Sequence, residues 1–114
     1  MGSLEHEIYQ LHSQLCAALA DPKRLLILYA LSERPMNVTE LAEKLELPQP
    51  TASRHLKMLR ERGLVVPERE GTSIFYSITD GRVIKALDML RAVLADQLQG
   101  QGELAESVSK NRTS

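Results

Sequence analysis

The stretch PQPTASRHLKMLRERGLV, residues 48–65, decides the fold of this chain. Its apolar side chains recur at helical spacing, at Ala52, Leu56 and Leu59, and predict a helix that packs by one side. Polar and basic side chains occupy another side of the same helix, at Ser53, Arg54, Lys57 and Arg60. Gly63 is the residue at which we expect this helix to stop.

A shorter helix precedes this stretch. Asn37, followed three residues later by Glu40, has the pattern of a capping box, which starts a helix. The apolar side of that helix consists of Leu41, Ala42 and Leu45. The two prolines of residues 47–50 cannot continue a helix, so the chain turns before the next helix begins near Gln49 or Pro50. The sequence therefore predicts a helix-turn-helix.

A β-hairpin is predicted after Gly63. Residues 64–66 and 74–78 are rich in β-branched and aromatic side chains, and they flank a polar tip, EREGTS, at residues 68–73. Small polar residues with a glycine at such a tip favour a tight reversal of the chain. The hairpin would form the wing of a winged helix-turn-helix.

Further helices flank this centre. Apolar residues recur in steps of three and four over residues 4–19, which predicts a first helix. Asp21 followed by Pro22 starts a second helix that runs to about Ser32, because Asp accepts amide protons at a helix start and Pro suits the first turn. Asp80 can cap the last helix. Its apolar face consists of Val83, Ile84, Leu87, Leu90, Val93, Leu94 and Leu98.

The predicted fold is mainly α with a small β-hairpin, a winged helix-turn-helix of order α-α-α-α-β-β-α. The terminal helices carry more apolar surface than so small a core needs, so we expect a homodimer through the first and last helices. The expected interface consists of Leu4, Ile8, Leu11, Leu15, Leu87, Leu90, Leu94 and Leu98. Residues 1–98 would form this single domain, and residues 99–114, which are poor in apolar side chains, a disordered polar tail.

The composition is that of a soluble globular protein, since 43% of the 114 residues are hydrophobic and 25% are charged. A net charge of −1 excludes a histone-like protein, and the basic residues gather between residues 49 and 69. The single cysteine, Cys16, cannot form an internal disulfide. Without a signal peptide or a membrane-spanning apolar run, we predict a cytoplasmic protein that does not bind membranes. No constellation of catalytic residues is found, so we do not expect an enzyme.

The polar side of residues 48–65 has the character of a helix that enters the major groove of DNA. Gln49 and Arg54 can each form paired hydrogen bonds with base edges. Ser53 is short enough to let the backbone approach, and Lys57 can hold a phosphate. The alternative interpretation of the same residues is a solvated helix face.

The hairpin favours nucleic acid over that alternative. A guanidinium group, a glycine and two hydroxyl groups at its tip suit contact with a phosphate or a minor groove. The predicted residues that bind double-stranded DNA are Gln49, Thr51, Ser53, Arg54, Lys57, Arg69, Gly71, Thr72 and Ser73. A winged-helix module that binds proteins and not DNA is the competing hypothesis.

Three strings, ALADPKRLLIL (18–28), ELAEKLELPQPTASRHLKMLRERGLV (40–65) and REGTSIFYSI (69–78), resemble the ArsR-type family of dimeric winged-helix repressors. The resemblance implies a homodimer that binds an inverted-repeat operator and is released by an effector. It places base and backbone contacts at Gln49, Ser53, Arg54 and Lys57, and wing contacts at Arg69 and Gly71. It also implies that His55 packs behind the helix.

The two metal sites known in that family have no counterpart in this sequence. Asn37 and Thr39 stand where one class has a Cys-x-Cys pair, and neither can act as a thiolate. The second class uses Asp and His ligands on the last helix. Its positions are occupied here by Asp80, Arg82, Val93 and Asp96, which have no imidazole and include an arginine. We therefore expect no metal cofactor at either site.

Cys16 and His12 leave one alternative open. They lie one helical turn apart, so two copies of the first helix could together supply two thiolates and two imidazoles to a metal ion. Oxidation of the Cys16 thiol between subunits is a related possibility. The competing interpretation is a cysteine packed at the dimer interface and a solvated histidine. The effector is not identified by the sequence.

Overall fold

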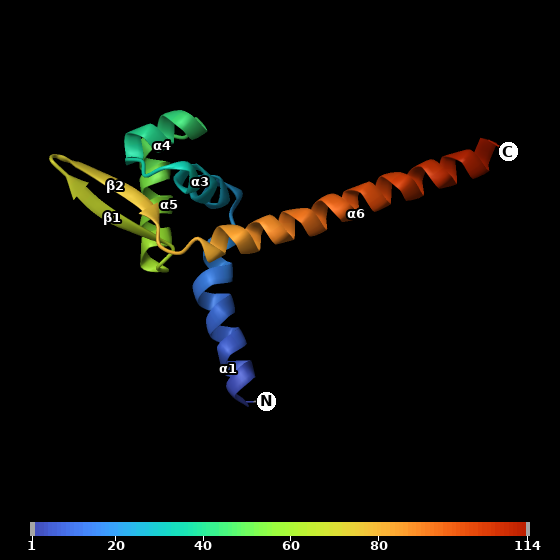
Figure 1. Cartoon of the computed structure of the whole chain (residues 1–114), viewed down its shortest axis with the longest axis horizontal. Coiled ribbons are helices and arrows are strands. Elements are labelled where there is room, and N and C mark those ends of the chain that lie inside the picture. The colour runs from blue at the N-terminus through green and yellow to red at the C-terminus, as the bar shows by residue number, and fades with distance from the viewer. Residues whose placement is uncertain (1, 114) are drawn as a thin grey trace. The chain divides into compact units, whose positions relative to one another are not determined.

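The computed structural model describes residues 2–113, with side chains described for residues 2–101. Two compact units are present, Met1–Gly81 and Arg82–Ser114. The first unit contains the elements α1 (Gly2–Leu11), the π-helix η1 (His12–Cys16), α2 (Ala17–Leu19), α3 (Pro22–Glu33), α4 (Val38–Leu45), α5 (Gln49–Glu61), β1 (Val65–Glu70) and β2 (Ser73–Ile78) (Figure 1). The predicted winged helix-turn-helix is confirmed.

Side-chain caps fix where α3 and α4 begin, as their sequence patterns predict. The Asp21 carboxylate accepts hydrogen bonds from the amides of Lys23 at 2.8 Å and Arg24 at 3.3 Å. Asn37 Oδ1 accepts the amide of Glu40 at 2.8 Å, and Glu40 Oε1 accepts the amide of Asn37 at 3.2 Å. Each cap satisfies amide groups that the first turn of a helix cannot pair.

Left-handed residues end the two helices of the helix-turn-helix. α4 ends at Glu46, whose φ of 54° is positive although it has a side chain. α5 ends at Arg62 and is followed by Gly63 at a φ of 77°, and the Leu64 amide donates to the Leu59 carbonyl at 2.9 Å. Both ends turn the chain sharply, because a left-handed residue reverses its direction.

The core of the first unit is purely hydrophobic. α3 and α4 pack against α5, and α3 also packs against β2. No charged or polar residue is buried among the described side chains. The largest fully buried side chains are Ile27, Leu28, Met36, Leu41, Leu56 and Leu59. α5 is thereby held by its apolar side, which leaves its polar side free for other contacts.

The wing is a regular antiparallel hairpin with a shorter tip than predicted. Pairing runs from Val65↔Ile78 to Glu70↔Ser73, so only Gly71 and Thr72 form the loop, and the predicted six-residue tip is wrong. A two-residue loop with positive φ at its first residue matches the twist of its strands, and Gly71 has a φ of 62°. At the base, Met36 pairs with Tyr76 through hydrogen bonds of 3.1 and 2.8 Å.

The helix predicted over residues 4–19 is present, but its regular path is interrupted. The Ala17 amide donates to the His12 carbonyl, five residues back, which makes η1 a π-helical turn between α1 and α2. None of the residues of α1 is buried. The first helix thus has an unpartnered apolar stripe and a widened turn near its end.

The second unit consists of α6 (Arg82–Thr113). Its helical backbone extends past Leu98, where the apolar stripe ends and where we expected the last helix to stop. Side chains of residues 102–114 lie outside the described residues, so the disordered tail at 99–114 stays a prediction. Across the described part of the chain, no helix is long and apolar enough to span a membrane.

Candidate nucleic-acid interface

The polar side of α5 is exposed, as contact with DNA requires. Ala52, Leu56 and Leu59 are buried behind the helix. The side chains of Gln49, Ser53, Arg54 and Lys57 are exposed, and that of Thr51 is half-buried. Their spacing in the sequence places these side chains on one side of the helix, and burial of the opposite, apolar side turns them toward solvent.

Two of the predicted base-reading side chains are held by neighbouring hydroxyl groups. Gln49 Nε2 donates to Thr39 Oγ1 at 3.3 Å, and Arg54 Nη2 donates to Thr51 Oγ1 at 3.4 Å. Side chains restrained before binding lose less conformational entropy when they meet their target. Thr39 was not predicted for this role, since it lies on α4, and only the folded turn brings it to Gln49.

The wing brings hydroxyl groups beside α5. A cavity of about 300 Å³ is lined by Ser53 together with Thr72 and Ser73 of the wing, and by Thr39 and Asn37 at the start of α4. Figure 1 shows the hairpin beside α5 in the same unit. Ser53, Thr72 and Ser73 are therefore brought together by the fold.

Arg69 is placed differently from the prediction. It lies on β1 opposite Ile74 and is exposed, two residues before Gly71 of the tip. Arg54, Lys57 and Arg69 do not line the cavity. They are three exposed cations on α5 and β1, of the charge that attracts a phosphate backbone.

His55 lies behind α5, half-buried, and does not belong to the exposed polar side. Its Nδ1 atom is 3.4 Å from Nη1 of Arg24 on α3. Burial lowers the pKa of His55, and the cations Arg24, Lys23 and Arg54 lower it further against the opposing effect of Asp21. The position agrees with the expectation that this histidine packs behind the helix.

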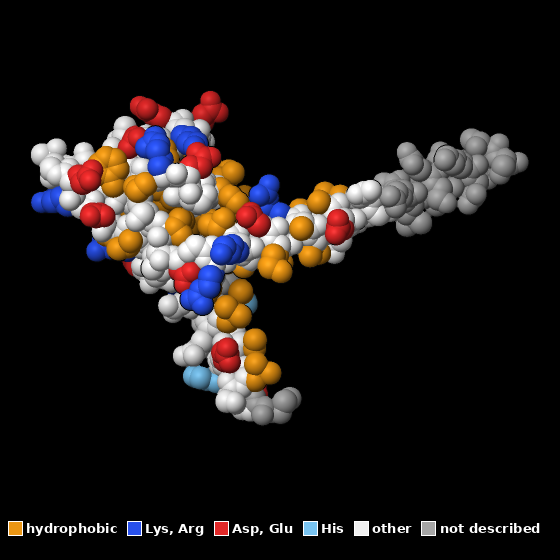
Figure 2. Space-filling view, in the orientation of Figure 1, with side chains coloured by type: hydrophobic (Ala, Val, Ile, Leu, Met, Phe, Trp, Pro, Cys, Tyr) orange, Lys and Arg blue, Asp and Glu red, His pale blue; other side chains and the backbone are white. Residues whose placement is uncertain are grey.

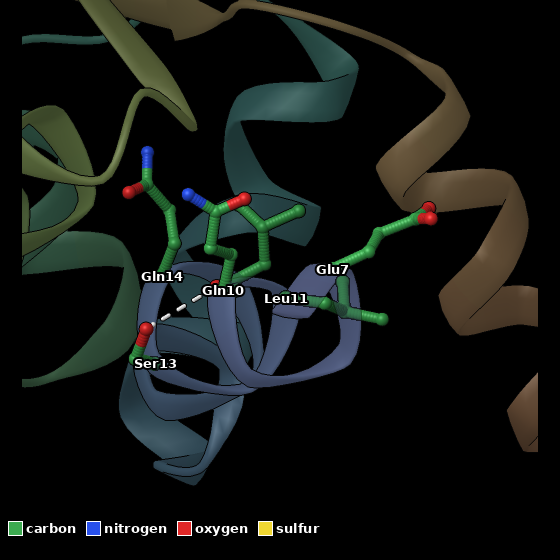
Figure 3. A pocket seen from close by; sticks show the side chains of 6 residues that line it. Glu7, Gln10, Leu11, Ser13 and Gln14 are labelled. Carbon is green, nitrogen blue, oxygen red and sulfur yellow. Dashed lines mark hydrogen bonds between the residues drawn. The ribbon is translucent and has the colours of Figure 1, made fainter. Parts of the chain in front are cut away.

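The predicted dimer residues of the first unit form an exposed stripe. Leu4 and Ile8 are 56% and 51% exposed, and Leu11 is exposed as well, whereas Leu15 is half-buried. Figure 2 shows hydrophobic side chains running along α1. A hollow of about 620 Å³ follows α1 and η1, where Leu11 and Leu15 lie beside polar side chains such as Gln10 and Ser13 (Figure 3).

Of the predicted dimer residues on α6, Leu90, Leu94 and Leu98 are exposed and Leu87 is buried. Met89 and Val93 extend the exposed apolar surface of this helix. An amphipathic helix that leaves most of its apolar side in water is expected to be covered by a partner.

His12 and Cys16 occupy the two ends of η1, and both are exposed. Within residues 2–101 no group of three or more His, Cys, Asp or Glu side chains is arranged to hold a metal ion. Any metal site at these two residues would need ligands from a second chain.

Comparison with known proteins places this fold in a family. Residues 21–66 match the profile described as "Bacterial regulatory protein, arsR family". The regulator MJ1325 of Methanocaldococcus jannaschii is 42% identical over 88 residues, which are 74% of this chain and 99% of that protein. NmtR of Mycobacterium tuberculosis is 48% identical over 71 residues, 62% of this chain and 59% of that protein.

A solved structure extends the likeness to the whole winged domain. The homodimeric winged helix-turn-helix domain Mb0332 from Mycobacterium bovis superposes with a TM-score of 0.74 at 28% identity, and covers 83% of this chain and 88% of that domain. The fold, the matched residues from Asp21 through Val66 and the near-complete coverage of MJ1325 lead to one conclusion: the chain belongs to the ArsR family of bacterial regulatory proteins.

Proposed function

We propose that this regulator binds an inverted-repeat operator as a homodimer and represses transcription by occluding it. In each protomer α5 would enter a major groove and the wing would contact the adjacent backbone or minor groove. Gln49 and Arg54 would read bases, whereas Thr51, Ser53, Lys57, Arg69, Gly71, Thr72 and Ser73 would contact the sugar-phosphate backbone. The operator half-sites would lie one helical turn or a small multiple apart.

The single observation that carries this proposal is the exposed polar side of α5 above a fully buried apolar side. Leu56 and Leu59 fix the helix in the core, while Arg54 and Lys57 are exposed. Ser53 of the same helix lines a cavity together with Thr72 and Ser73 of the wing. A generic solvated helix has no need for a hairpin hydroxyl pair at its side. The arrangement suits a groove lined by phosphates.

The homodimer is proposed to form through α1 and α6. Their exposed apolar stripes supply the surface, and the homodimeric state of Mb0332 supports the assembly. A twofold axis between the protomers would place two copies of α5 for two inverted half-sites.

The effector is proposed to act away from the two metal positions named above. Asn37 Oδ1 is occupied by the Glu40 amide, and Thr39 Oγ1 by Gln49, so neither is free to bind a soft metal ion. At Asp80, Arg82, Val93 and Asp96 the donor set contains a cation and an alkyl group and does not fit a transition metal. A metal or thiol effector at Cys16 and His12 is the alternative.

Selection from a random duplex library tests the proposal. An enriched inverted repeat would give the operator, which is then titrated at several salt concentrations. If the dimer neutralises roughly six to eight phosphates, the logarithm of affinity falls against the logarithm of salt concentration with a slope of about −5 to −7. A chain that enriches no sequence but retains a protein partner would instead be a protein-interaction module.

A further inference from the structure

We propose that Arg24 is a positioning residue for DNA recognition, which holds the recognition helix α5 against the end of the first helix through an uncharged His55. This inference rests on the proposed function. It adds Arg24, which is not among the predicted DNA contacts, and it requires that the imidazole of His55 is neutral.

Arg24 is anchored in the end of the first helix. Its side chain is only 13% exposed. Nε donates to the carbonyl of Ala18 at 2.6 Å, and Nη2 donates to the carbonyl of Ala17 at 3.2 Å. Carbonyls in the last turn of a helix have few amide partners, and a planar guanidinium can reach two of them at once. The Ala17 carbonyl accepts the Ala20 amide at 3.4 Å in addition to Arg24. Arg24 is thereby fixed to α2.

The third contact reaches the recognition helix. Nη1 of Arg24 lies 3.4 Å from Nδ1 of His55, which is 31 residues away in the sequence. A guanidinium is always charged and only donates hydrogen bonds. His55 must therefore accept at Nδ1 and carry its single proton on Nε2, which makes the imidazole neutral.

The surroundings of His55 favour that neutral form. Burial of the ring lowers the pKa of His55, because it disfavours the charged imidazole. Asp21 opposes this effect, whereas the cations Arg24 and Lys23 on the facing helix and Arg54 on α5 lower the pKa further. Protonation would put two cations in contact and abolish the hydrogen bond, so α5 would lose its link to α2.

A second guanidinium ties α5 to the same helical path. Arg62, the residue that ends α5, donates from Nη1 to the Ser13 carbonyl at 3.0 Å. Where a helix returns from π-type to α-type hydrogen bonds, one backbone carbonyl is passed over by the amides of the next turn. Ser13 lies at this point, since it directly follows His12, whose carbonyl accepts the π-type bond. Two bridges thus connect the recognition helix to the helix whose apolar stripe is proposed to meet the partner.

The orientation of α5 relative to that stripe sets the distance between the two recognition helices of a dimer. A loosened bridge should therefore weaken binding to a complete inverted repeat more than binding to random DNA. A merely structural role would instead reduce the amount of folded protein without this selectivity.

The experiment measures affinity of the full chain for its selected operator from about pH 7.5 down to the lowest pH at which the folded dimer persists, because burial lowers the pKa of His55 and moves its protonation to more acidic pH. The folded state and the dimer are verified at each pH. We expect wild-type affinity to fall about fivefold or more on acidification, as loss of one hydrogen bond in each protomer implies. General electrostatic attraction predicts the opposite, because extra positive charge strengthens binding to phosphates.

His55→Asn is the decisive variant, since an amide oxygen can accept from Arg24 but does not titrate. It should bind the operator within about twofold of the wild type at neutral pH, and its affinity should not fall on acidification. Arg24→Gln should bind more weakly throughout this pH range and also lose the pH dependence. If Arg24→Gln fails to fold, His55→Asn alone still decides.

Wild-type affinity that is constant or rises at low pH would overturn the role of Arg24 and His55. A pH dependence that persists unchanged in His55→Asn would do the same. A wild-type chain without an operator at any pH contradicts the proposed function itself, and this outcome is distinct from the other two.

Discussion

α5 and α1 are two amphipathic helices of the same unit, but their apolar sides differ in burial. α5 buries its apolar side in its own chain, and Leu56 and Leu59 are inaccessible to solvent. α1 has leucines and an isoleucine at similar spacing, yet buries no residue, and Ile8 is half in water. The same apolar spacing therefore packs into the core in one helix and, as proposed, into a dimer interface in the other. The spacing indicates that an apolar face will be buried, but it does not indicate whether the same chain or a second chain buries it.

The largest effect should follow from a charge on the α1 stripe. Ile8→Glu should weaken dimerisation by about 3–6 kcal/mol, because two copies each lose a buried isoleucine. Sedimentation over a concentration series measures this change. His6→Glu, on the opposite side of α1, is the matched control and should leave the dimer intact. A dimer of undiminished affinity in Ile8→Glu would remove α1 from the interface.

The second largest effect should follow from a mutation that creates a cavity behind α5. Leu56→Ala should lower the free energy of unfolding by about 2–5 kcal/mol, since the side chain is fully buried in the core. Urea unfolding at a fixed protein concentration measures it, because dimerisation contributes to stability. The neighbouring exposed variant Lys57→Ala should stay within about 0.5 kcal/mol of the wild type. Equal losses in both variants would contradict the division of α5 into two sides.

The outward side of α5 should divide into base reading and phosphate binding. Arg54→Ala should cost about 1–3 kcal/mol of operator affinity and relax specificity at one base position. Lys57→Ala should weaken operator and random DNA alike and reduce the steepness of the salt slope by about 1. Titration of both variants on both duplexes measures this. Identical profiles for the two variants would refute the assignment of roles.

The smallest effect concerns the turn that presents α5. Glu46 has a positive φ, so Glu46→Gly should raise the free energy of unfolding by about 0.5–1 kcal/mol by relieving a conformation unfavourable for a side chain. Glu43→Gly, inside α4, is the control and should lower it by about 1 kcal/mol. Thermal unfolding of both variants provides the measurement. A destabilised Glu46→Gly would show that its side chain matters more than its backbone.

Local chemistry explains what could be predicted from the sequence. The caps of Asp21 and Asn37 use residues two or three positions apart, and the stop at Gly63 depends on its own backbone. Such patterns can be recognised in a sequence because the interacting residues are close together in the chain. The polar side of α5 was predictable for the same reason, since its members share one helix. Their contacts with DNA stay predictions.

Contacts between distant segments were not predictable. Arg24 and His55 are 31 residues apart, and Arg62 and Ser13 are 49 apart. Nothing in the local pattern pairs them. The π-helical turn was not predictable either, because apolar steps of three and four over residues 4–19 are those of an ordinary α-helix. The wing tip was misplaced because charged residues of strands and of loops look alike in sequence.

The pairing of Met36 with Tyr76 has a consequence for how such a protein can diversify. It pins the base of the hairpin to the loop before α4, so any change in wing length must occur at the Gly71–Thr72 end. Each residue added to both strands lengthens the hairpin by about 3.3 Å and turns every later side chain to the other face. Only additions of two residues per strand keep the outward faces, so the length of this wing can change only in increments of about 7 Å.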